Sequence, residues 1–262
     1  MTDTDAFRAV DEWLNRCRRP LLVTHQRPDG DALGALAAVA GELRRRGQTP
    51  VVALFDPVPP RYALLASLAP WKDWAQVAPT AGACDALVIV DTCARAQLAP
   101  LADLLADAPR TLVIDHHATG DALAERPVDL KLCDPQAGAA CLLVAEWLLA
   151  CGGVRDADVA TALFTGLATD TGWFRFPSTT ARELRAAAAL VEAGAAPHTI
   201  HRAVFEQDPP GRLRLVARAL SSLELLADGR LAVLGLRQAD FAAAGDDLTM
   251  TEDLVNEVGR LA

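Results

Sequence analysis

The sequence contains no run of about 18 uncharged apolar residues, the length that a membrane-spanning helix needs. Its first residues, Met1 to Asp5, are acidic, whereas a secretory signal begins with basic residues and continues into an apolar segment. Both absences argue against a membrane protein and against secretion. We therefore expect a cytoplasmic protein that acts away from membranes.

Cysteine occurs six times, but no two cysteines are spaced as a CxxC pair. Most of them lie in apolar surroundings, as buried thiols do in a reducing compartment. Disulfide bonds and a structural zinc site are therefore not expected. Cys93, which closely follows an apolar run, is expected to be a small buried side chain rather than a nucleophile.

Positive charge is scarce, because 25 Lys and Arg residues face 34 Asp and Glu residues and the net charge is −9. Tight binding to long duplex DNA depends on many basic contacts to phosphates, so this class of partner is not expected. Bound divalent metal ions would supply positive charge locally.

The chain has 262 residues, 52% of them hydrophobic, which is enough for one large α/β domain and a smaller one. Short apolar runs alternate with helical stretches rich in Ala and Leu, and this order predicts a parallel sheet flanked by helices. The predicted strands are Leu21 to Thr24, Val51 to Phe55, Ala86 to Val90 and Thr111 to Ile114.

Polar residues follow three of these runs directly, namely His25, Asp91 and Asp115. In open α/β sheets, ligands bind at the carboxyl ends of the strands, so these side chains are expected at one edge. Two adjacent histidines, His116 and His117, among only five in the chain, fall at the same edge. This grouping predicts a metal site.

The segment from His25 to Asp31 brings three candidate metal ligands, His25, Asp29 and Asp31, within seven residues, with Gly30 allowing a tight turn. A turn followed by a helix cap would explain Asp29 and Asp31 equally well if nothing else were present.

Cap and stop signals predict several helices. One begins near Asp31, which is expected to cap it, and stops before Gly47; the others are Ala137 to Ala150, Asp156 to Ala168 with Asp170 at its end, and a helix that opens at the capping box Thr180 to Glu183 and ends at Gly194.

The character of the sequence changes after Gly194. Residues 195 to 212 contain three prolines and are expected to form a linker. Beyond it, the runs Leu223 to Leu226 and Arg230 to Leu236 flank Asp228-Gly229, which predicts a β-hairpin in a second α/β domain. The segment Thr251 to Leu261 has helical spacing but no strand to cover, so this smaller domain is expected to be truncated.

Four segments resemble the DHH phosphoesterase family, over roughly the first 190 residues: His25 to Gly34, Val90 to Thr92, Ile114 to His117 and Ala168 to Thr180. The linker sequence His198 to Pro210 is similar to the branch whose members act both as oligoribonucleases and as 3′-phosphoadenosine 5′-phosphate phosphatases. The resemblance implies a DHH catalytic domain over 1–194, a linker over 195–212 and a partial C-terminal DHH-associated substrate domain over 213–262.

The resemblance also implies two metal ions that share Asp91 as a bridging ligand. The implied ligands are His25, Asp29 and Asp91 for one ion, and Asp31, Asp91, His116 and Asp170 for the other. Imidazole and carboxylate donors without a thiolate favour Mn²⁺, with Mg²⁺ or Co²⁺ as alternatives.

Two further residues are candidates for the chemical step. Asp115 is expected to orient His116 or a neighbouring group, and His117 to contact the phosphate or to protonate the leaving oxygen. Arg27, Arg95 and Arg175 are candidate clamps for substrate phosphates, although a solvated surface position explains each of them equally well.

Contacts from other segments to the substrate are less clear from the sequence. Trp173 and Phe174 could stack on a base, but packing is the commoner role of aromatics beside a helix end. The family often has a helix start rich in Ser and Thr where this chain has Gln136 to Ala140, so hydroxyl contacts to substrate are not expected there.

The resemblance implies a manganese-dependent phosphoesterase that hydrolyses short oligoribonucleotides to mononucleotides and 3′-phosphoadenosine 5′-phosphate to AMP. It also implies a homodimer. Two alternatives stay open: a linear or cyclic dinucleotide phosphodiesterase with the same metals, and a truncated metal-binding fragment that lacks substrate recognition. The second alternative is favoured by the absence of the glycine-rich, histidine-containing motif that the family's C-terminal domain normally carries.

Overall fold

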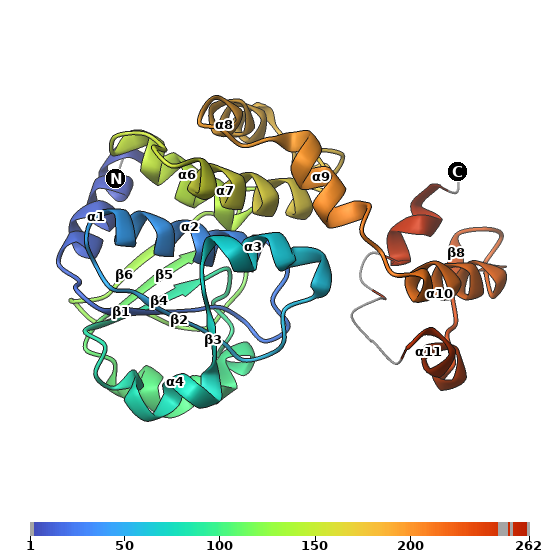
Figure 1. Ribbon diagram of the computed structural model, residues 1–262, viewed down its shortest axis with the longest axis horizontal. Coiled ribbons are helices and arrows are strands. Elements are labelled where there is room, and N and C mark those ends of the chain that lie inside the picture. The colour runs from blue at the N-terminus through green and yellow to red at the C-terminus, as the bar shows by residue number, and fades with distance from the viewer. Residues whose placement is uncertain (1–2, 246–250, 252–253, 261–262) are drawn as a thin grey trace. The chain divides into compact units, whose positions relative to one another are not determined.

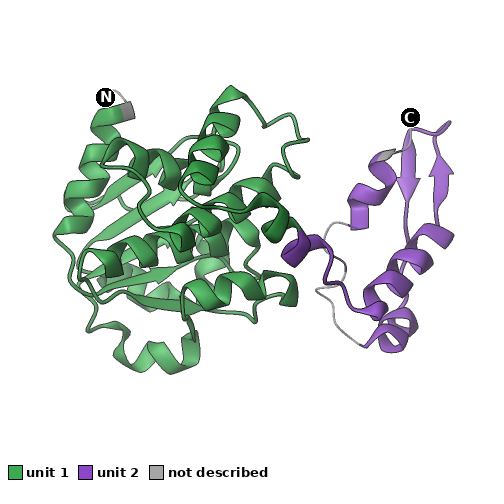
Figure 2. Ribbon diagram, turned by 45° about the horizontal axis from the view of Figure 1, so that its top comes forward, with its two compact units in different colours: residues 1–201 green, residues 202–262 purple. Residues whose placement is uncertain are grey.

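The computed structural model describes residues 3–245, 251 and 254–260. The chain divides into two compact units, residues 1–201 and 202–262 (Figure 2). The division falls inside the segment 195–212 that we expected to be a linker. The finer domain boundaries at residues 194 and 213 stay predictions.

Unit 1 is built on a parallel sheet of six strands in the order β3-β2-β1-β4-β5-β6 (Figure 1). The strands are β1 (Pro20–Val23), β2 (Val51–Leu54), β3 (Lys72–Asp73), β4 (Ala86–Val90), β5 (Thr111–Asp115) and β6 (Leu130–Cys133). The predicted α/β class and the four predicted strands are confirmed. The two edge strands were not predicted, because β3 has only two residues, both exposed, and β6 carries an exposed lysine within its short apolar run.

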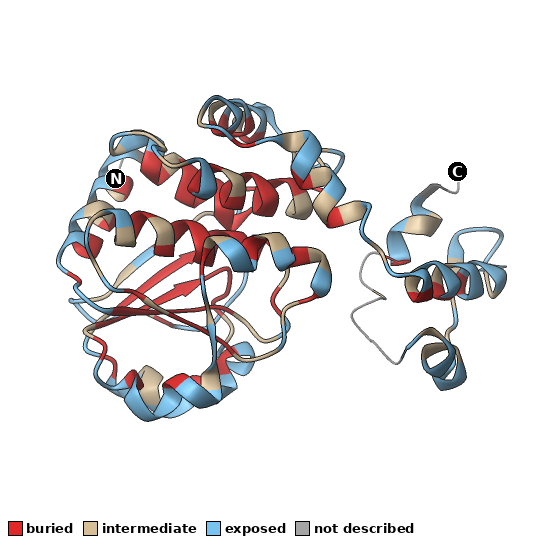
Figure 3. Ribbon diagram, viewed as in Figure 1, coloured by how far each residue is buried: buried red, intermediate tan, exposed pale blue. Residues whose placement is uncertain are grey.

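Helices cover both faces of this sheet. Those of unit 1 are α1 (Asp3–Asn15), α2 (Gly30–Arg45), α3 (Ala63–Leu68), α4 (Trp74–Ala81), α5 (Ala102–Asp107), α6 (Ala140–Ala150), α7 (Ala157–Asp170) and α8 (Ala181–Glu192), with 3₁₀ turns at Pro60–Tyr62 and Arg95–Leu101. Figure 1 shows α2, α6 and α7 on one face and α4 on the other. The central strands β4 and β5 are buried along their whole length (Figure 3), which explains their unbroken apolar sequence.

Helix α2 packs closely against α7. A Cβ atom at Gly34 would lie 2.5 Å from the carbonyl oxygen of Ala162 in α7, so the lack of a side chain permits this approach. The close contact brings the first turn of α2 near the last turn of α7, and thereby Asp31 near Asp170.

The helix starts differ from the sequence expectations in detail. Helix α2 begins at Gly30 with Asp29 as its N-cap, so the expectation that Asp31 caps this helix was wrong. Asp29 accepts hydrogen bonds from the backbone N–H groups of Asp31 and Ala32, each over 3.0 Å. Helix α6 begins at Ala140, three residues later than predicted, because residues 134–139 form a turn. The capping box of Thr180 and Glu183 at α8 is confirmed.

Unit 2 contains α10 (Pro210–Ser221), β7 (Glu224–Leu226), β8 (Leu231–Val233), α11 (Gln238–Ala244) and a 3₁₀ helix at Leu254–Arg260, while α9 (Pro197–Phe205) crosses the division. The antiparallel hairpin of β7 and β8 is confirmed, whereas α11 was not predicted. Part of the helical segment predicted over 251–261 lies outside the described residues, and the truncation of this domain stays a prediction. Among the helices of the described residues, none combines the length and the apolar character that crossing a membrane requires.

Candidate metal centre

The carboxyl ends of three neighbouring strands form the site. β1 delivers His25, β4 delivers Asp91, and β5 ends at Asp115 and delivers His116. The N–H group of Asp91 donates to the Ile114 carbonyl over 2.8 Å, which ties the ends of β4 and β5 together. Asp91 has a φ of 59°, a left-handed conformation that is costly for a non-glycine residue and turns the chain sharply at the sheet edge.

His25, Asp29 and Asp91 form the first group of candidate ligands. Their ligand atoms all lie within 4.8 Å of one another. Nε2 of His25 is 3.4 Å from Oδ2 of Asp91, while its Nδ1 lies 2.8 Å from the Gln26 carbonyl oxygen. Because the backbone carbonyl accepts the Nδ1 proton, Nε2 is left as the nitrogen that can bind a metal ion.

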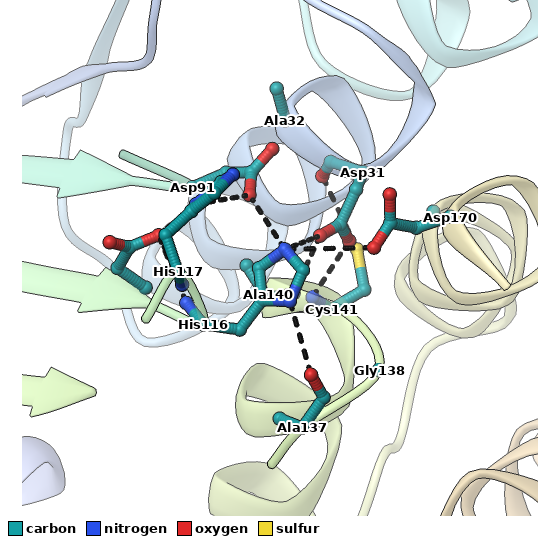
Figure 4. A network of polar contacts seen from close by, with 12 residues as sticks. Asp31, Ala32, Asp91, His116, His117, Ala137, Gly138, Ala140, Cys141 and Asp170 are labelled. Carbon is teal, nitrogen blue, oxygen red and sulfur yellow. Dashed lines mark hydrogen bonds and ion pairs between the residues drawn. The ribbon is translucent and has the colours of Figure 1, made fainter. Parts of the chain in front are cut away.

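Asp31, His116 and Asp170 form the second group, again within 4.8 Å (Figure 4). Nε2 of His116 is 3.8 Å from Asp31 Oδ2, 3.6 Å from Asp170 Oδ2 and 3.4 Å from Asp91 Oδ1. Nδ1 of His116 donates to the carbonyl oxygen of Ala137 over 3.1 Å. Both histidines thus use a backbone carbonyl to direct Nε2 toward carboxylates.

Asp91 connects the two groups. One of its oxygens faces His25 and the other faces His116, and Oδ1 is buried without a hydrogen-bond partner. A buried carboxylate oxygen without a donor is costly, and a cation beside it would remove that cost. Among the described residues, the ion pairs of Asp31, Asp91 and Asp170 involve only histidines. No Lys or Arg side chain in the part of the chain that the structure describes neutralises these three carboxylates. The donor set therefore fits divalent metal ions.

The local charge shifts the pKa values of the ligands strongly. Burial raises the pKa of Asp31 well above its usual value and that of Asp170 to about 6. Burial alone would lower the pKa of the two histidines, but the surrounding carboxylates raise it to about 9 for His25 and about 10 for His116. Bound divalent ions would replace the protons that this cluster attracts.

The N-terminus of α6 stabilises the negative charge of the buried Asp31 carboxylate. The carboxylate accepts hydrogen bonds from the backbone N–H groups of Ala140 over 2.5 Å and of Cys141 over 2.8 Å (Figure 4). Donors at a helix N-terminus stabilise a negative charge. This contact was not predicted from the sequence, since it joins segments that are far apart in the chain.

Asp115 and His117 form a hydrogen-bonded pair beside the two groups. Oδ1 of Asp115 accepts from Nδ1 of His117 over 2.7 Å and from the backbone N–H of His116 over 2.9 Å. The bond to Asp115 raises the pKa of His117, and it holds the pKa of Asp115 low although burial opposes this. The His117 side chain is 53% exposed, so its Nε2 is accessible to a small molecule.

Glu183 is a second contributor that the sequence did not indicate. Its side chain is fully buried, and Oε1 accepts a hydrogen bond from the N–H of Gly138 over 3.1 Å. Oε2 accepts from the N–H of Thr180 over 2.7 Å. The residue that completes the capping box of α8 therefore also holds the turn whose Ala137 carbonyl orients His116.

The three candidate substrate arginines are all exposed. The backbone N–H of Arg27 donates to Asp56, while the guanidinium groups of Arg95 and Arg175 donate to the carbonyl oxygens of Ala122 and Gly172. Their role in binding phosphates stays a prediction.

Trp173 and Phe174 pack against Phe164, with ring centroids 5.9 Å and 5.8 Å from its ring. The two side chains thus pack against α7, and their stacking on a base stays a prediction. The ring of Trp173 also meets that of His201 in α9 at 4.9 Å, edge to face.

Residues 20–167 match the DHH family, N-terminal domain. The chain is 29% identical over 232 residues to the bifunctional oligoribonuclease and PAP phosphatase NrnA of Thermus thermophilus, a match that covers 87% of this chain and 66% of that protein.

Two solved structures resemble this fold. An exopolyphosphatase-related protein from Bacteroides fragilis has a TM-score of 0.89 at 21% identity, covering 98% of this chain and 76% of the other. A Methanococcus jannaschii protein described as a family II inorganic pyrophosphatase has a TM-score of 0.55 at 18% identity, covering 91% and 79%. At these identities the likeness concerns the fold alone.

Proposed function

The chain belongs to the DHH family, and we propose that it uses two Mn²⁺ ions to hydrolyse short oligoribonucleotides to mononucleotides and 3′-phosphoadenosine 5′-phosphate to AMP. The observation that carries this proposal is the position of Asp91 between two groups of ligands, one with each histidine. The identity to a bifunctional oligoribonuclease and PAP phosphatase supports the substrate class.

We assign the ligands as two sets that share Asp91. His25, Asp29 and Asp91 would hold one ion, and Asp31, Asp91, His116 and Asp170 the other. A mixture of imidazole and carboxylate donors suits Mn²⁺, and Mg²⁺ or Co²⁺ could replace it. When bound, such a pair of cations lowers the pKa of water and neutralises the oxygens of a reacting phosphoryl group.

The side chains of the protein would then position the substrate and move protons. With Nδ1 held by Asp115, the exposed Nε2 of His117 would face the phosphate and donate a proton to the leaving oxygen. Asp115 would keep the ring in one orientation and favour its protonated form. Arg27, Arg95 and Arg175 would add contacts to more distant phosphates of the substrate.

The charge of the protein favours small substrates. The net charge of −9 disfavours binding of long duplex nucleic acid, which depends on many basic contacts to phosphates, whereas two metal ions would attract a single phosphate group. We propose a cytoplasmic enzyme that works as a homodimer on short oligoribonucleotides and small nucleotides.

The test is product analysis with the purified chain. Diribonucleotide, 3′-phosphoadenosine 5′-phosphate and a cyclic dinucleotide should be incubated separately with Mn²⁺ or with excess chelator. We expect release of mononucleotides and AMP from the first two, and none with chelator. His116→Ala should be inactive, while His198→Ala, an exposed residue of α9, should retain activity. Hydrolysis of the cyclic dinucleotide alone, or no hydrolysis by a chain loaded with two Mn²⁺, would contradict the proposal.

A further inference from the structure

A third group of potential ligands lies directly beside the metal centre. The thiols of Cys93 and Cys133 and a carboxylate oxygen of Asp115 are all within 4.8 Å of one another. Asp115 and Cys133 end the adjacent strands β5 and β6 and are paired in register, while Cys93 follows the end of β4. Neither cysteine belongs to the six proposed ligands of the main centre.

Asp115 has a buried oxygen that receives no hydrogen bond from an N–H group or a hydroxyl of the described residues. Burial raises the pKa of this carboxylate, but His117 and the nearby Cys93 thiol lower it. Oδ1 accepts the hydrogen bonds from His117 and from the backbone of His116, but Oδ2 is buried and has no such donor. The whole residue has an exposed fraction of 0%. A buried carboxylate oxygen that lies next to two thiols and has no N–H or O–H donor is a place where a cation would be stabilised.

The chemistry of this group differs from that of the main centre. Thiolates select soft or borderline ions such as Zn²⁺ and Cd²⁺, whereas the main centre offers only imidazole and carboxylate donors. Cys93 is buried, but Cys133 is partly exposed, which gives an ion a route from solvent. Cys133 Sγ also lies 3.8 Å from the His117 carbonyl oxygen, which is a further potential metal ligand.

We propose that Cys93, Asp115 and Cys133 form a separate site for a thiophilic divalent ion, Zn²⁺ or Cd²⁺. On binding, each thiol releases its proton to solvent, two metal–sulfur bonds form, and one carboxylate oxygen of Asp115 completes the protein ligands. The sequence did not indicate this site, because the cysteines lack the short spacing of a zinc motif and meet only through the pairing of strands.

Binding at this site would affect catalysis through Asp115. The same carboxylate holds Nδ1 of His117, and a cation on its other oxygen would weaken its attraction for the imidazolium ring. We therefore expect Zn²⁺ to inhibit hydrolysis even when Mn²⁺ fills the main centre. This consequence rests on the proposed function, whereas the binding of the ion does not.

The test is a titration of the full chain, preloaded with Mn²⁺, with Cd²⁺ under a phosphine reductant. The readout is the ultraviolet charge-transfer band between thiolate and cadmium, which requires no activity. We expect the band to saturate at one added ion per chain and to be lost in Cys93→Ala and Cys133→Ala. The matched controls are Cys84→Ala, also buried, and Cys151→Ala, also partly exposed, which should keep the band.

Circular dichroism and retained Mn²⁺ binding would establish that each variant is folded. Absence of the band in the unchanged protein, or its persistence in both Cys93→Ala and Cys133→Ala, would overturn the proposed site. In the activity assay, Zn²⁺ should inhibit the unchanged protein more strongly than folded Cys133→Ala. Equal inhibition of the two proteins would overturn the inhibitory consequence.

Discussion

Nδ1 of His117 donates a hydrogen bond to Oδ1 of Asp115 over 2.7 Å. The carboxylate is fully buried at the end of β5, whereas the imidazole is 53% exposed. The pair therefore anchors one side of the ring inside the protein and leaves the other side accessible. The neighbouring His116 differs, because its side chain is largely buried and its Nε2 faces three carboxylates rather than solvent.

This difference predicts separate effects for the two histidines. His117→Ala should slow turnover by about 10² or more while leaving bound metal almost unchanged, because we propose that the ring acts on substrate rather than on metal. His116→Ala should lose metal as well as activity. Steady-state kinetics together with elemental analysis would check this. Equal loss of metal in both variants would contradict the division of roles.

Asp91→Ala should have a larger effect than Asp29→Ala. Asp91 turns one oxygen toward each of His25 and His116, so its loss disturbs both groups of ligands, whereas Asp29 belongs to one group only. We expect hydrolysis to be abolished and the metal content to fall below that of Asp29→Ala. Near-normal turnover of Asp91→Ala with two bound ions would refute the assignment.

Metal affinity should rise with pH. In the metal-free protein, burial would lower the pKa of both histidines, but nearby carboxylates raise it to about 9 for His25 and about 10 for His116. Near neutral pH both rings hold a proton that must leave before Nε2 can bind an ion. Because the carboxylates raise the pKa of both histidines, protons compete with the metal ion for Nε2 until the pH exceeds about 9 for His25 and about 10 for His116.

Calorimetric titration with Mn²⁺ in buffers of different ionisation enthalpy would measure the released protons. We expect net proton release near pH 7 that decreases as the pH approaches 9, with tighter binding at the higher pH. His198→Ala serves as a control for an exposed histidine outside the centre and should behave as the unchanged protein. An affinity independent of pH from about 6 to about 9 would contradict the raised pKa values.

Glu183→Gln should weaken both the fold and the metal centre. The side chain is fully buried and binds the N–H groups of Gly138 and Thr180, so its replacement should lower the free energy of unfolding by about 1–3 kcal/mol. It should also weaken Mn²⁺ binding, because the turn that orients His116 loses its anchor.

Glu146→Gln is a suitable control for that variant. Glu146 pairs near the surface with Arg182, which also pairs with Asp134 of the turn. However, Glu146 makes none of the hydrogen bonds of Glu183. Its loss should therefore cost about 1 kcal/mol at most and weaken Mn²⁺ binding less than the loss of Glu183 does. Urea unfolding of the metal-free proteins and Mn²⁺ titration would compare the two. Indistinguishable results for Glu183→Gln and Glu146→Gln would show that the buried carboxylate has no positioning role.

Local patterns in the sequence determined much of this protein. Unbroken apolar runs fixed β4 and β5 as buried strands, and the Thr180 and Glu183 box marked the start of α8. Both signals are patterns of neighbouring residues: an apolar run marks a strand that can be buried on both faces, and a helix cap is satisfied within a few positions of the chain. The short ligand-rich segments at strand ends also indicated which residue types the site would use.

Only the tertiary structure decided how those segments combine. The order of the strands brings β1 beside β4 and β4 beside β5, and so places His25, Asp91 and His116 at one edge. Because α2 packs against α7 and α6, the Asp31 carboxylate accepts hydrogen bonds from backbone amides of α6. Asp29, and not Asp31, is the N-cap of α2. The meeting of Cys93 with Cys133 depends on strand pairing in the same way. Such contacts join distant segments, and their free energy comes from packing that no local spacing encodes.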